Sequence, residues 1–185
     1  MAVFCGSSTG NDPVFSEAAR RVGATLAARN IRLVYGAGNV GLMGVLADAV
    51  LEAGGQVHGV IPEFLKAYEV CHDGLSELTV TQTMHERKQI MADTADAFIV
   101  LPGGFGTLDE FFEILTWRQL HLHNKPIGVL NVDGFYDALE THVRHLVGTG
   151  FIRPENLDLY CTASDIDTLL SKMTERRQGA VDKWA

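Results

Sequence analysis

A glycine-rich loop followed by two carboxylates is the part of the sequence best suited to chemistry. The loop, Pro102-Gly103-Gly104-Phe105-Gly106-Thr107, leads through Leu108 to Asp109 and Glu110. Glycine lets backbone N–H groups approach an anion closely, and the positive end of a helix dipole at the same place favours that anion. A carboxylate beside a bound sugar phosphate suits the stabilisation of a cation forming at the anomeric carbon, which favours a catalytic role for Glu110.

The same residues also have a purely structural interpretation. The stretch from Thr107 to Glu110 matches the T-x-x-E capping box, in which the threonine caps a helix and the glutamate returns to the threonine N–H. This interpretation accounts for Thr107 and Glu110, but it does not explain why Asp109 joins Glu110 beside a loop suited to anions. On the sequence, both interpretations stay open.

Two further glycine-rich segments follow predicted strands. Gly6-Ser7-Ser8 comes after a strand at 2–5, and Gly36-Ala37-Gly38-Asn39-Val40-Gly41 comes after a strand at 31–35. Because the carboxyl ends of parallel strands meet at one edge of a sheet, we expect the three loops to gather there. The sequence therefore predicts a phosphate site, with candidate ligands at Ser7, Ser8, Gly38, Gly103, Gly104, Gly106 and Thr107.

The second loop supports a rival interpretation. Gly36, Gly38 and Gly41 match the G-x-G-x-x-G dinucleotide fingerprint, and Glu63 follows at the distance expected of a ribose-binding acid. That pattern by itself favours an NAD-dependent oxidoreductase. Against it, the match follows the second predicted strand rather than the first, and it leaves the third loop without a role.

A predicted helix at 84–94 supplies a cation. Met84, Arg87 and Met91 fall on one face at i, i+3, i+7 spacing, so Arg87 lies on an apolar stripe where an isolated charge is costly. A phosphate or carboxylate that accepts two hydrogen bonds from the guanidinium would offset the cost of burying this charge. Lys88 lies at the edge of the same face, where a solvated, snorkelling side chain is the simpler explanation.

Short β-branched runs alternate with amphipathic stretches along the chain, which predicts βαβ units. We expect a Rossmann-like α/β fold, a doubly wound parallel sheet with helices on both faces, as one domain over 1–176 with a polar tail at 177–185. The expected strands are 2–5, 31–35, 57–61, 78–81, 97–101 and 127–131, with an unassigned segment at 158–161. The expected helices are 14–29 (capped by Asp12), 42–53, 84–94, 108–119, 136–147 and 166–176.

Composition narrows the class of protein. The 185 residues carry a formal net charge of −8, which argues against a nucleic-acid partner. The three cysteines form no CxxC pair, and the sequence has neither an N-terminal leader nor 18 consecutive apolar residues, so we expect a cytoplasmic protein without a membrane partner. The histidine pairs at 121/123 and 142/145 lack neighbouring carboxylates or cysteines, so no metal site is expected.

The third loop also resembles a known family signature. The stretch from Pro102 to Glu110 matches the PGGxGTxxE motif of the Lonely Guy (LOG) family, the cytokinin riboside 5'-monophosphate phosphoribohydrolases, which are often mislabelled as lysine decarboxylases. Further family-like segments follow in family order: Cys5-Gly6-Ser7-Ser8, Gly41-Leu42-Met43-Gly44, Met84-His85-Glu86-Arg87-Lys88, Leu115-Thr116-Trp117 and Asn131-Val132-Asp133-Gly134. The resemblance implies a Rossmann-like homodimer that hydrolyses the N-glycosidic bond of purine nucleoside 5'-monophosphates. The products would be a free base, typically an N6-modified adenine, and ribose 5-phosphate.

The resemblance also assigns roles. It implies that Arg87 and Glu110 are the catalytic pair. It further implies substrate contacts at Glu69, Lys88, Gly104, Phe105, Gly106, Thr107, Leu108, Asp109 and Thr116. Met84, beside the catalytic arginine on the same helix face, and Gly103 in the third loop are further substrate-binding candidates. Ala37 stands where the family usually has a glycine, and the chain begins within its first predicted strand.

Activity on AMP is expected in addition to activity on cytokinin nucleotides. The hydrolase needs neither a metal nor an organic cofactor, because loss of the base requires only electrostatics and positioning.

Several functional alternatives remain beside the hydrolase. A non-catalytic nucleotide or cofactor carrier of the same fold would bind without turnover. A pyridoxal-phosphate decarboxylase is disfavoured, because none of the five lysines has a recognisable Schiff-base context.

Overall fold

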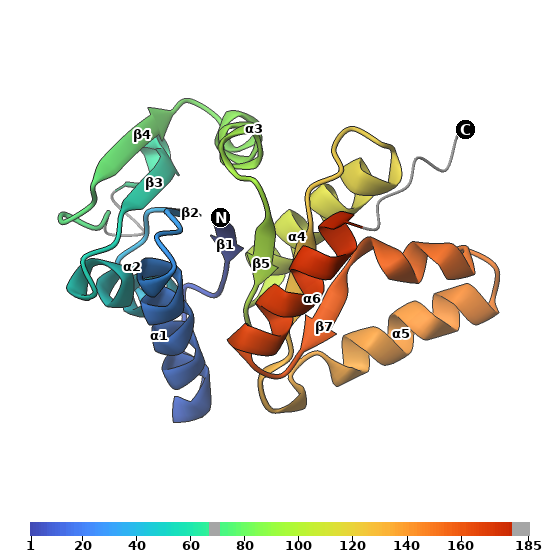
Figure 1. The fold of residues 1–185 in the computed structure, drawn as a ribbon. Coiled ribbons are helices and arrows are strands. Elements are labelled where there is room, and N and C mark those ends of the chain that lie inside the picture. The colour runs from blue at the N-terminus through green and yellow to red at the C-terminus, as the bar shows by residue number, and fades with distance from the viewer. Residues whose placement is uncertain (67–70, 179–185) are drawn as a thin grey trace.

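The computed structural model describes residues 1–66 and 71–178, and they build one seven-stranded sheet (Figure 1). The strand order is β4-β3-β2-β1-β5-β6-β7, and every neighbouring pair is parallel. The strands are β1 (Ala2–Phe4), β2 (Leu33–Tyr35), β3 (Val57–Pro62), β4 (Glu77–Thr81), β5 (Phe98–Val100), β6 (Ile127–Leu130) and β7 (Cys161–Ala163). The predicted Rossmann-like α/β fold is confirmed.

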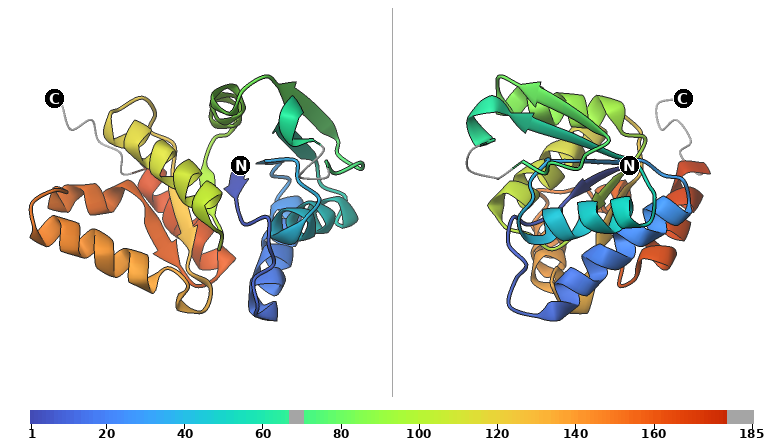
Figure 2. Two further views of the ribbon diagram at one scale, coloured as in Figure 1. Left: turned by 180° about the vertical axis from the view of Figure 1, so that it is seen from behind. Right: turned by 90° about the vertical axis from the view of Figure 1, so that its left-hand side faces the viewer.

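Helices cover both faces of the sheet (Figure 2). One face packs on α1 (Pro13–Ala28), α2 (Gly41–Glu52) and α6 (Ile166–Gln178). The other packs on α3 (Met84–Thr94), α4 (Phe105–Gln119) and part of α5 (Asp137–Gly148). Three short 3-10 helices, η1 (Glu63–Leu65), η2 (Val132–Gly134) and η3 (Pro154–Leu159), lie in the connections.

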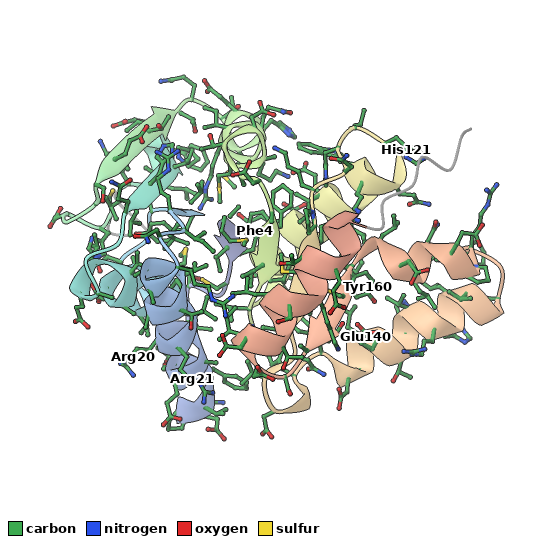
Figure 3. The ribbon with its side chains drawn as sticks, viewed as in Figure 1. Phe4, Arg20, Arg21, His121, Glu140 and Tyr160 are labelled. Carbon is green, nitrogen blue, oxygen red and sulfur yellow. The ribbon has the colours of Figure 1, made fainter. Side chains whose placement is uncertain are left out.

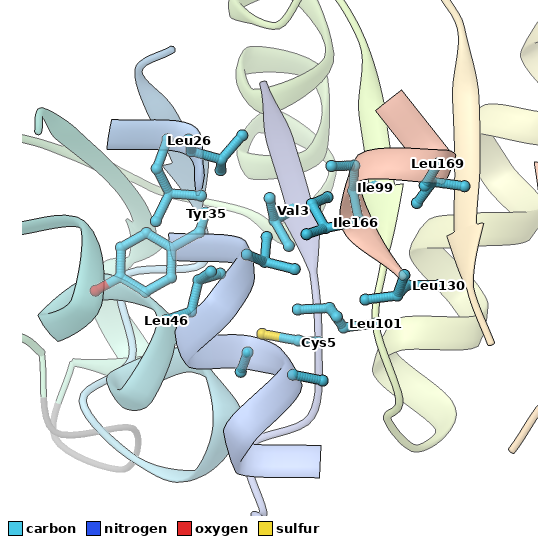
Figure 4. Close-up of a cluster of buried hydrophobic side chains, with 14 of the residues drawn as sticks. Val3, Cys5, Leu26, Tyr35, Leu46, Ile99, Leu101, Leu130, Ile166 and Leu169 are labelled. Carbon is cyan, nitrogen blue, oxygen red and sulfur yellow. The ribbon is translucent and has the colours of Figure 1, made fainter. Parts of the chain in front are cut away.

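The pleat of each central strand divides its side chains between two cores. In β1, Val3 points into the α1/α2/α6 core, whereas Ala2 and Phe4 point into the α3/α4 core. In the first of these cores, Val3, Cys5 and Leu101 lie close to the α1 and α2 side chains (Figure 4). Burial on both faces explains why the central strands are almost uniformly apolar.

The doubly wound topology determines where a ligand binds. The chain runs outward from β1 through β2 and β3 to β4, then returns to β5 on the other side of β1. The loops after β1 and β5 therefore diverge at the carboxyl edge of the sheet and leave a crevice, which is where open α/β sheets bind ligands.

Most of the predicted elements agree with the structure within one or two residues. Asp12 caps α1 as expected, since its carboxylate accepts from the Val14 N–H at 2.9 Å. Two elements differ: α4 begins three residues before the predicted start at 108, and the segment at 158–161 contains the end of η3 and the start of β7. Glu69 and residues 179–185 of the predicted tail lie outside the described residues. Among the helices described, none has both the length and the apolar character needed to cross a bilayer.

Candidate active site

A cavity of about 170 Å³ lies at the carboxyl edge of the sheet, between the loops that follow β1 and β5. It brings together Arg87 from α3 and Glu110 from α4, the two residues predicted to form the catalytic pair. The residues that line it are Val3, Phe4, Cys5, Gly6, Ser7, Gly36, Met43, Arg87, Gly104, Phe105, Gly106, Thr107 and Glu110.

The N-terminus of α4 forms one wall of this cavity. Gly104 is the N-cap residue, and among the described residues no side chain caps this end of the helix. The capping-box interpretation, one of the two left open by the sequence, is therefore wrong: Thr107 lies inside the first turn, three residues after the N-cap. The first-turn N–H groups of an uncapped helix lack intrahelical acceptors, and together with the helix dipole they attract an anion.

The loops after β1 and β5 hold each other in place. The Gly6 N–H donates to the Pro102 carbonyl at 3.0 Å, and the Gly6 carbonyl accepts from the Leu42 N–H at 3.0 Å. Thr107 is buried against Gly103, where an added Cβ would collide with the threonine hydroxyl. By contrast, a Cβ added at Gly104 or Gly106 would meet nothing within 4 Å. The α4 end of the cavity is thus rigid on its inner side and open on the ligand side.

Gly36 lines the cavity, but the rest of the loop after β2 has little room for a ligand. Gly41 has a φ of +63°, and a Cβ there would overlap the backbone of Ser7 and Ser8. Gly38 forms a single antiparallel bridge with Cys71. Ala37 is buried beside Gly59 and does not line the cavity. The glycine spacing of a dinucleotide fingerprint therefore serves close packing, because the crevice lies between β1 and β5 rather than after β2.

Arg87 is buried, with 5% of its surface exposed, and main-chain carbonyls hold its guanidinium. Nε donates to the Val60 carbonyl at 3.0 Å, and Nη2 donates to the Gly36 carbonyl at 3.1 Å. Hydrogen bonds from a charged group contribute about 1.5–3 kcal/mol each, which offsets part of the cost of burial. The sheet thus fixes a positive charge at the cavity wall, on the apolar helix face that the sequence indicated.

Glu110 is half-buried and shares the cavity with the Cys5 thiol. Burial, with a smaller effect from the charge of Glu110, raises the pKa of Cys5 far above its usual range. Burial therefore favours the protonated thiol, and Cys5 packs in the core as a small apolar side chain.

Lys88 does not line the cavity. Its Nζ lies 3.1 Å from Asp109 Oδ2 and 2.9 Å from Glu113 Oε1, and its side chain is only 10% exposed. We expected a solvated, snorkelling side chain, but Lys88 instead extends from α3 to the carboxylates on α4. Burial lowers the pKa of Lys88, but its hydrogen bonds to Glu113 and Asp109 outweigh burial and leave the pKa raised.

The other predicted site residues fall into two groups. Ser7, Gly104, Phe105, Gly106 and Thr107 line the cavity with the catalytic pair. Ser8, Gly38, Met84, Gly103, Leu108, Asp109 and Thr116 lie outside its lining. Met84 nevertheless contacts the site indirectly, since its sulfur lies 3.8 Å from Nη1 of Arg87. Sequence reasoning missed the apolar wall of Val3, Phe4 and Met43, for which strand and helix periodicity predicts only core packing.

A second hollow, of about 390 Å³, lies in the C-terminal half of the molecule. Its lining comes from α5, η3, β7 and α6 and includes Glu140 and Tyr160 (Figure 3). Charges of both signs surround it, and Lys172 and Glu140 are already hydrogen-bonded to Thr162. It has no glycine loop or helix N-terminus aimed into it, so the smaller cavity is the better candidate active site. Elsewhere, too, the described residues hold no group of three or more His, Cys, Asp or Glu arranged as metal ligands.

The topology and the cavity together define a Rossmann-like α/β protein with a crevice at its switch point, beside an uncapped helix N-terminus. A family model described as "Possible lysine decarboxylase" matches residues 43–173. A probable cytokinin riboside 5'-monophosphate phosphoribohydrolase of Oryza sativa subsp. japonica is 47% identical over 175 residues, covering 95% of this chain and 77% of the relative. A cytokinin riboside 5'-monophosphate phosphoribohydrolase of Arabidopsis thaliana is 45% identical over 95% of this chain and 82% of its own length. The chain belongs to this family, the Lonely Guy phosphoribohydrolases.

Solved structures of lower identity share the fold. A molybdenum cofactor binding protein of Rippkaea orientalis superimposes with a TM-score of 0.69 at 20% identity over 94% of both chains. A Moco carrier protein of Chlamydomonas reinhardtii gives a TM-score of 0.70 at 19% identity over 96% of both chains. At these identities the likeness supports the fold alone.

Proposed function

We propose that this protein hydrolyses the N-glycosidic bond of purine nucleoside 5'-monophosphates, including cytokinin-type N6-modified adenine nucleotides and AMP. The observation that carries the proposal is the position of Arg87 and Glu110, which come from different helices and line one cavity beside the open N-terminus of α4. The names of the relatives support the reaction class and the cytokinin base. Activity on AMP extends the proposal beyond those names.

In this proposal the 5'-phosphate binds at the N-terminus of α4. The backbone N–H groups there and the open space at Gly104 and Gly106 suit an anion, and the nearby Ser7 supplies a hydroxyl. Arg87 adds a fixed positive charge, which orients the phosphate and offsets the net charge of −8 on the whole chain.

Glu110 acts on the ribose. As the bond between C1' and the purine nitrogen breaks, the electron pair leaves with the base and positive charge develops on the ribosyl ring. The Glu110 carboxylate stabilises that charge or takes a proton from the water that adds to C1', and the departing purine gains a proton. This chemistry calls for no metal or organic cofactor.

The size of the cavity supports a proposed position for the base. Pockets that enclose a whole ligand commonly measure ~300–1,000 Å³, whereas this cavity measures about 170 Å³. The phosphate and ribose fill it in our proposal, and the base extends past Phe105, which is 94% exposed at the mouth. Comparing kcat/KM for AMP and isopentenyladenosine monophosphate tests how far this open side discriminates between bases.

We further propose a cytoplasmic homodimer. Phe111 packs in the core, but Phe105 and Phe112 on α4 are exposed, as are Leu120 and Leu122 just after it. Exposed apolar side chains on and just after α4 suit a subunit interface. The three free cysteines suit a reducing compartment. Light scattering on the purified protein tests the dimer, and a monomeric mass at micromolar concentration contradicts it.

Glu110→Gln tests the catalytic assignment. The amide keeps the shape of the side chain but neither stabilises a cation nor accepts a proton, so we expect kcat to fall by about 10²–10⁴-fold with the melting temperature nearly unchanged. Release of adenine from AMP, followed by chromatography, is the measurement. Glu52→Gln, at an exposed position on α2, is the matched control. Near-wild-type release by the Glu110 variant overturns the assignment, and nucleotide binding without turnover by the wild-type protein favours a carrier.

A further inference from the structure

Lys88 connects the two helices that carry the proposed catalytic pair. It follows Arg87 directly on α3, and its Nζ pairs with Asp109 and Glu113 on α4, at 3.1 and 2.9 Å. These carboxylates lie one residue before and three residues after Glu110. The cation therefore links the position of α3 to the segment of α4 from which Glu110 reaches the cavity.

The two carboxylates depend on this cation. Asp109 and Glu113 are four residues apart on one helix, and like charges at that spacing repel each other. Asp109 is 62% exposed, so solvent screens it, but Glu113 is only 22% exposed. Removing the cation leaves the partly buried Glu113 carboxylate without this partner, and that uncompensated charge favours a shift of α4 that exposes it to water.

Arg87 is fixed independently of this contact. Its guanidinium is held by the Val60 and Gly36 carbonyls, which belong to the β2–β3 side of the sheet. Glu110 lies on α4, which follows β5 on the other side of β1. A displacement of α4 relative to the sheet therefore moves Glu110 relative to these two anchors of Arg87.

We infer that Lys88 is a positioning residue for the reaction: it holds Glu110 in register with Arg87 through Asp109 and Glu113, rather than binding the phosphate itself. The inference rests on the proposed function. The Lys88 ammonium pairs with two carboxylates, and its side chain lies outside the cavity lining. Its charge therefore acts on α4 rather than on the contents of the cavity.

The experiment compares Lys88→Met, Lys88→Arg, Glu113→Gln and the Lys88→Met/Glu113→Gln double variant. We measure kcat and KM for AMP, and inhibition by the product ribose 5-phosphate as a reporter of phosphate binding. Lys88→Met is expected to lower kcat by about 10- to 100-fold, the loss that a misplacement near 1 Å brings. KM and the inhibition constant should stay within about threefold, since the phosphate contacts are intact. Lys88→Arg restores most of kcat because it keeps the charge.

The double variant separates positioning from an independent role. If Lys88 acts through Glu113, removing both leaves no unpaired buried charge, and kcat falls no further than in Lys88→Met alone. Lys125→Ala is the matched control, since that lysine donates to the Ala92 carbonyl at 2.7 Å and so ties down the far end of α3. It should lower the melting temperature without lowering kcat.

Each outcome has a distinct meaning. Unchanged kcat with a tenfold rise in KM and in the ribose 5-phosphate inhibition constant overturns the inference and makes Lys88 a phosphate ligand. Losses of kcat that simply add up in the double variant overturn it as well. A wild-type protein that releases no base from any nucleotide overturns the proposed function itself, and this role with it.

Discussion

The loop after β2 and the loop after β5 are both glycine-rich connections from a parallel strand to a helix, yet their glycines have different surroundings. A Cβ at Gly36 would meet the Arg87 guanidinium, and a Cβ at Gly41 would meet the Ser7 backbone. A Cβ at Gly104 or Gly106 would meet open space. In the first loop, glycine allows parts of the protein to approach each other. In the second, it leaves the surface open at the place where we propose that the phosphate binds.

The difference follows from the strand order. The loop after β5 lies at the switch point beside β1, where neighbouring loops diverge, whereas the loop after β2 lies within a run of strands whose connections all turn the same way. The N-terminus of α2 is closed by a neighbouring loop, since the Leu42 N–H donates to Gly6. A glycine motif therefore indicates an anion site only when the topology leaves its helix N-terminus open.

Gly41→Ala should produce the largest effect on folding. The new Cβ overlaps main-chain atoms of Ser7 and Ser8, which cannot move aside as a side-chain end can, and the φ of +63° adds strain. We expect a loss of about 3 kcal/mol or more in the free energy of unfolding. Urea denaturation measures it. A variant of wild-type stability would show that the loop after β2 is not packed as described.

Gly106→Ala should behave in the opposite way. The methyl group meets no atom within 4 Å, and alanine favours the helix, so the free energy of unfolding should rise by up to about 1 kcal/mol. The methyl group also narrows the approach to the N–H groups of α4. We expect KM for AMP to rise by about tenfold, the loss of roughly one charge-assisted hydrogen bond. Lower stability together with an unchanged KM contradicts an open anion site at this end of α4.

The sequence carried enough information for the fold and for Arg87. Strand and helix periods depend on local residue types, so α3 was located to the residue and Arg87 was placed correctly on its apolar face. The resemblance pointed to Glu110, and the three loops were assigned to the correct edge of the sheet. These features repeat at short spacing or follow directly from the alternation of strands and helices.

The contacts that distinguish the two loops are not local, and so they were missed. T-x-x-E matches a capping box at Thr107, but the N-cap is Gly104 and the helix begins at Phe105, three residues before the predicted start. Lys88 meets two carboxylates on a different helix, and nothing in the spacing along one helix indicates them. The packing of Gly41 against Ser7 depends on how two loops meet across the sheet edge.

Ala37→Gly should give the smallest effect and is the finest test of the comparison. Ala37 has a φ of +63° and is fully buried, so glycine removes about 1–2 kcal/mol of backbone strain. Glycine also loses a buried methyl group, about 0.8 kcal/mol, and gains freedom in the unfolded chain, about 0.4–1 kcal/mol. The opposing contributions leave the free energy of unfolding within about 1 kcal/mol of wild type.

Kinetics of the same variant complete the test. Because Ala37 does not line the cavity, KM for AMP should stay at the wild-type value. Ala37→Val is the contrasting variant, since a β-branched side chain at positive φ beside Gly59 is both strained and overpacked. It should destabilise the protein by about 2 kcal/mol or more. If Ala37→Gly instead lowers KM, the loop after β2 contacts the substrate, and the division between a packed and an open glycine loop fails.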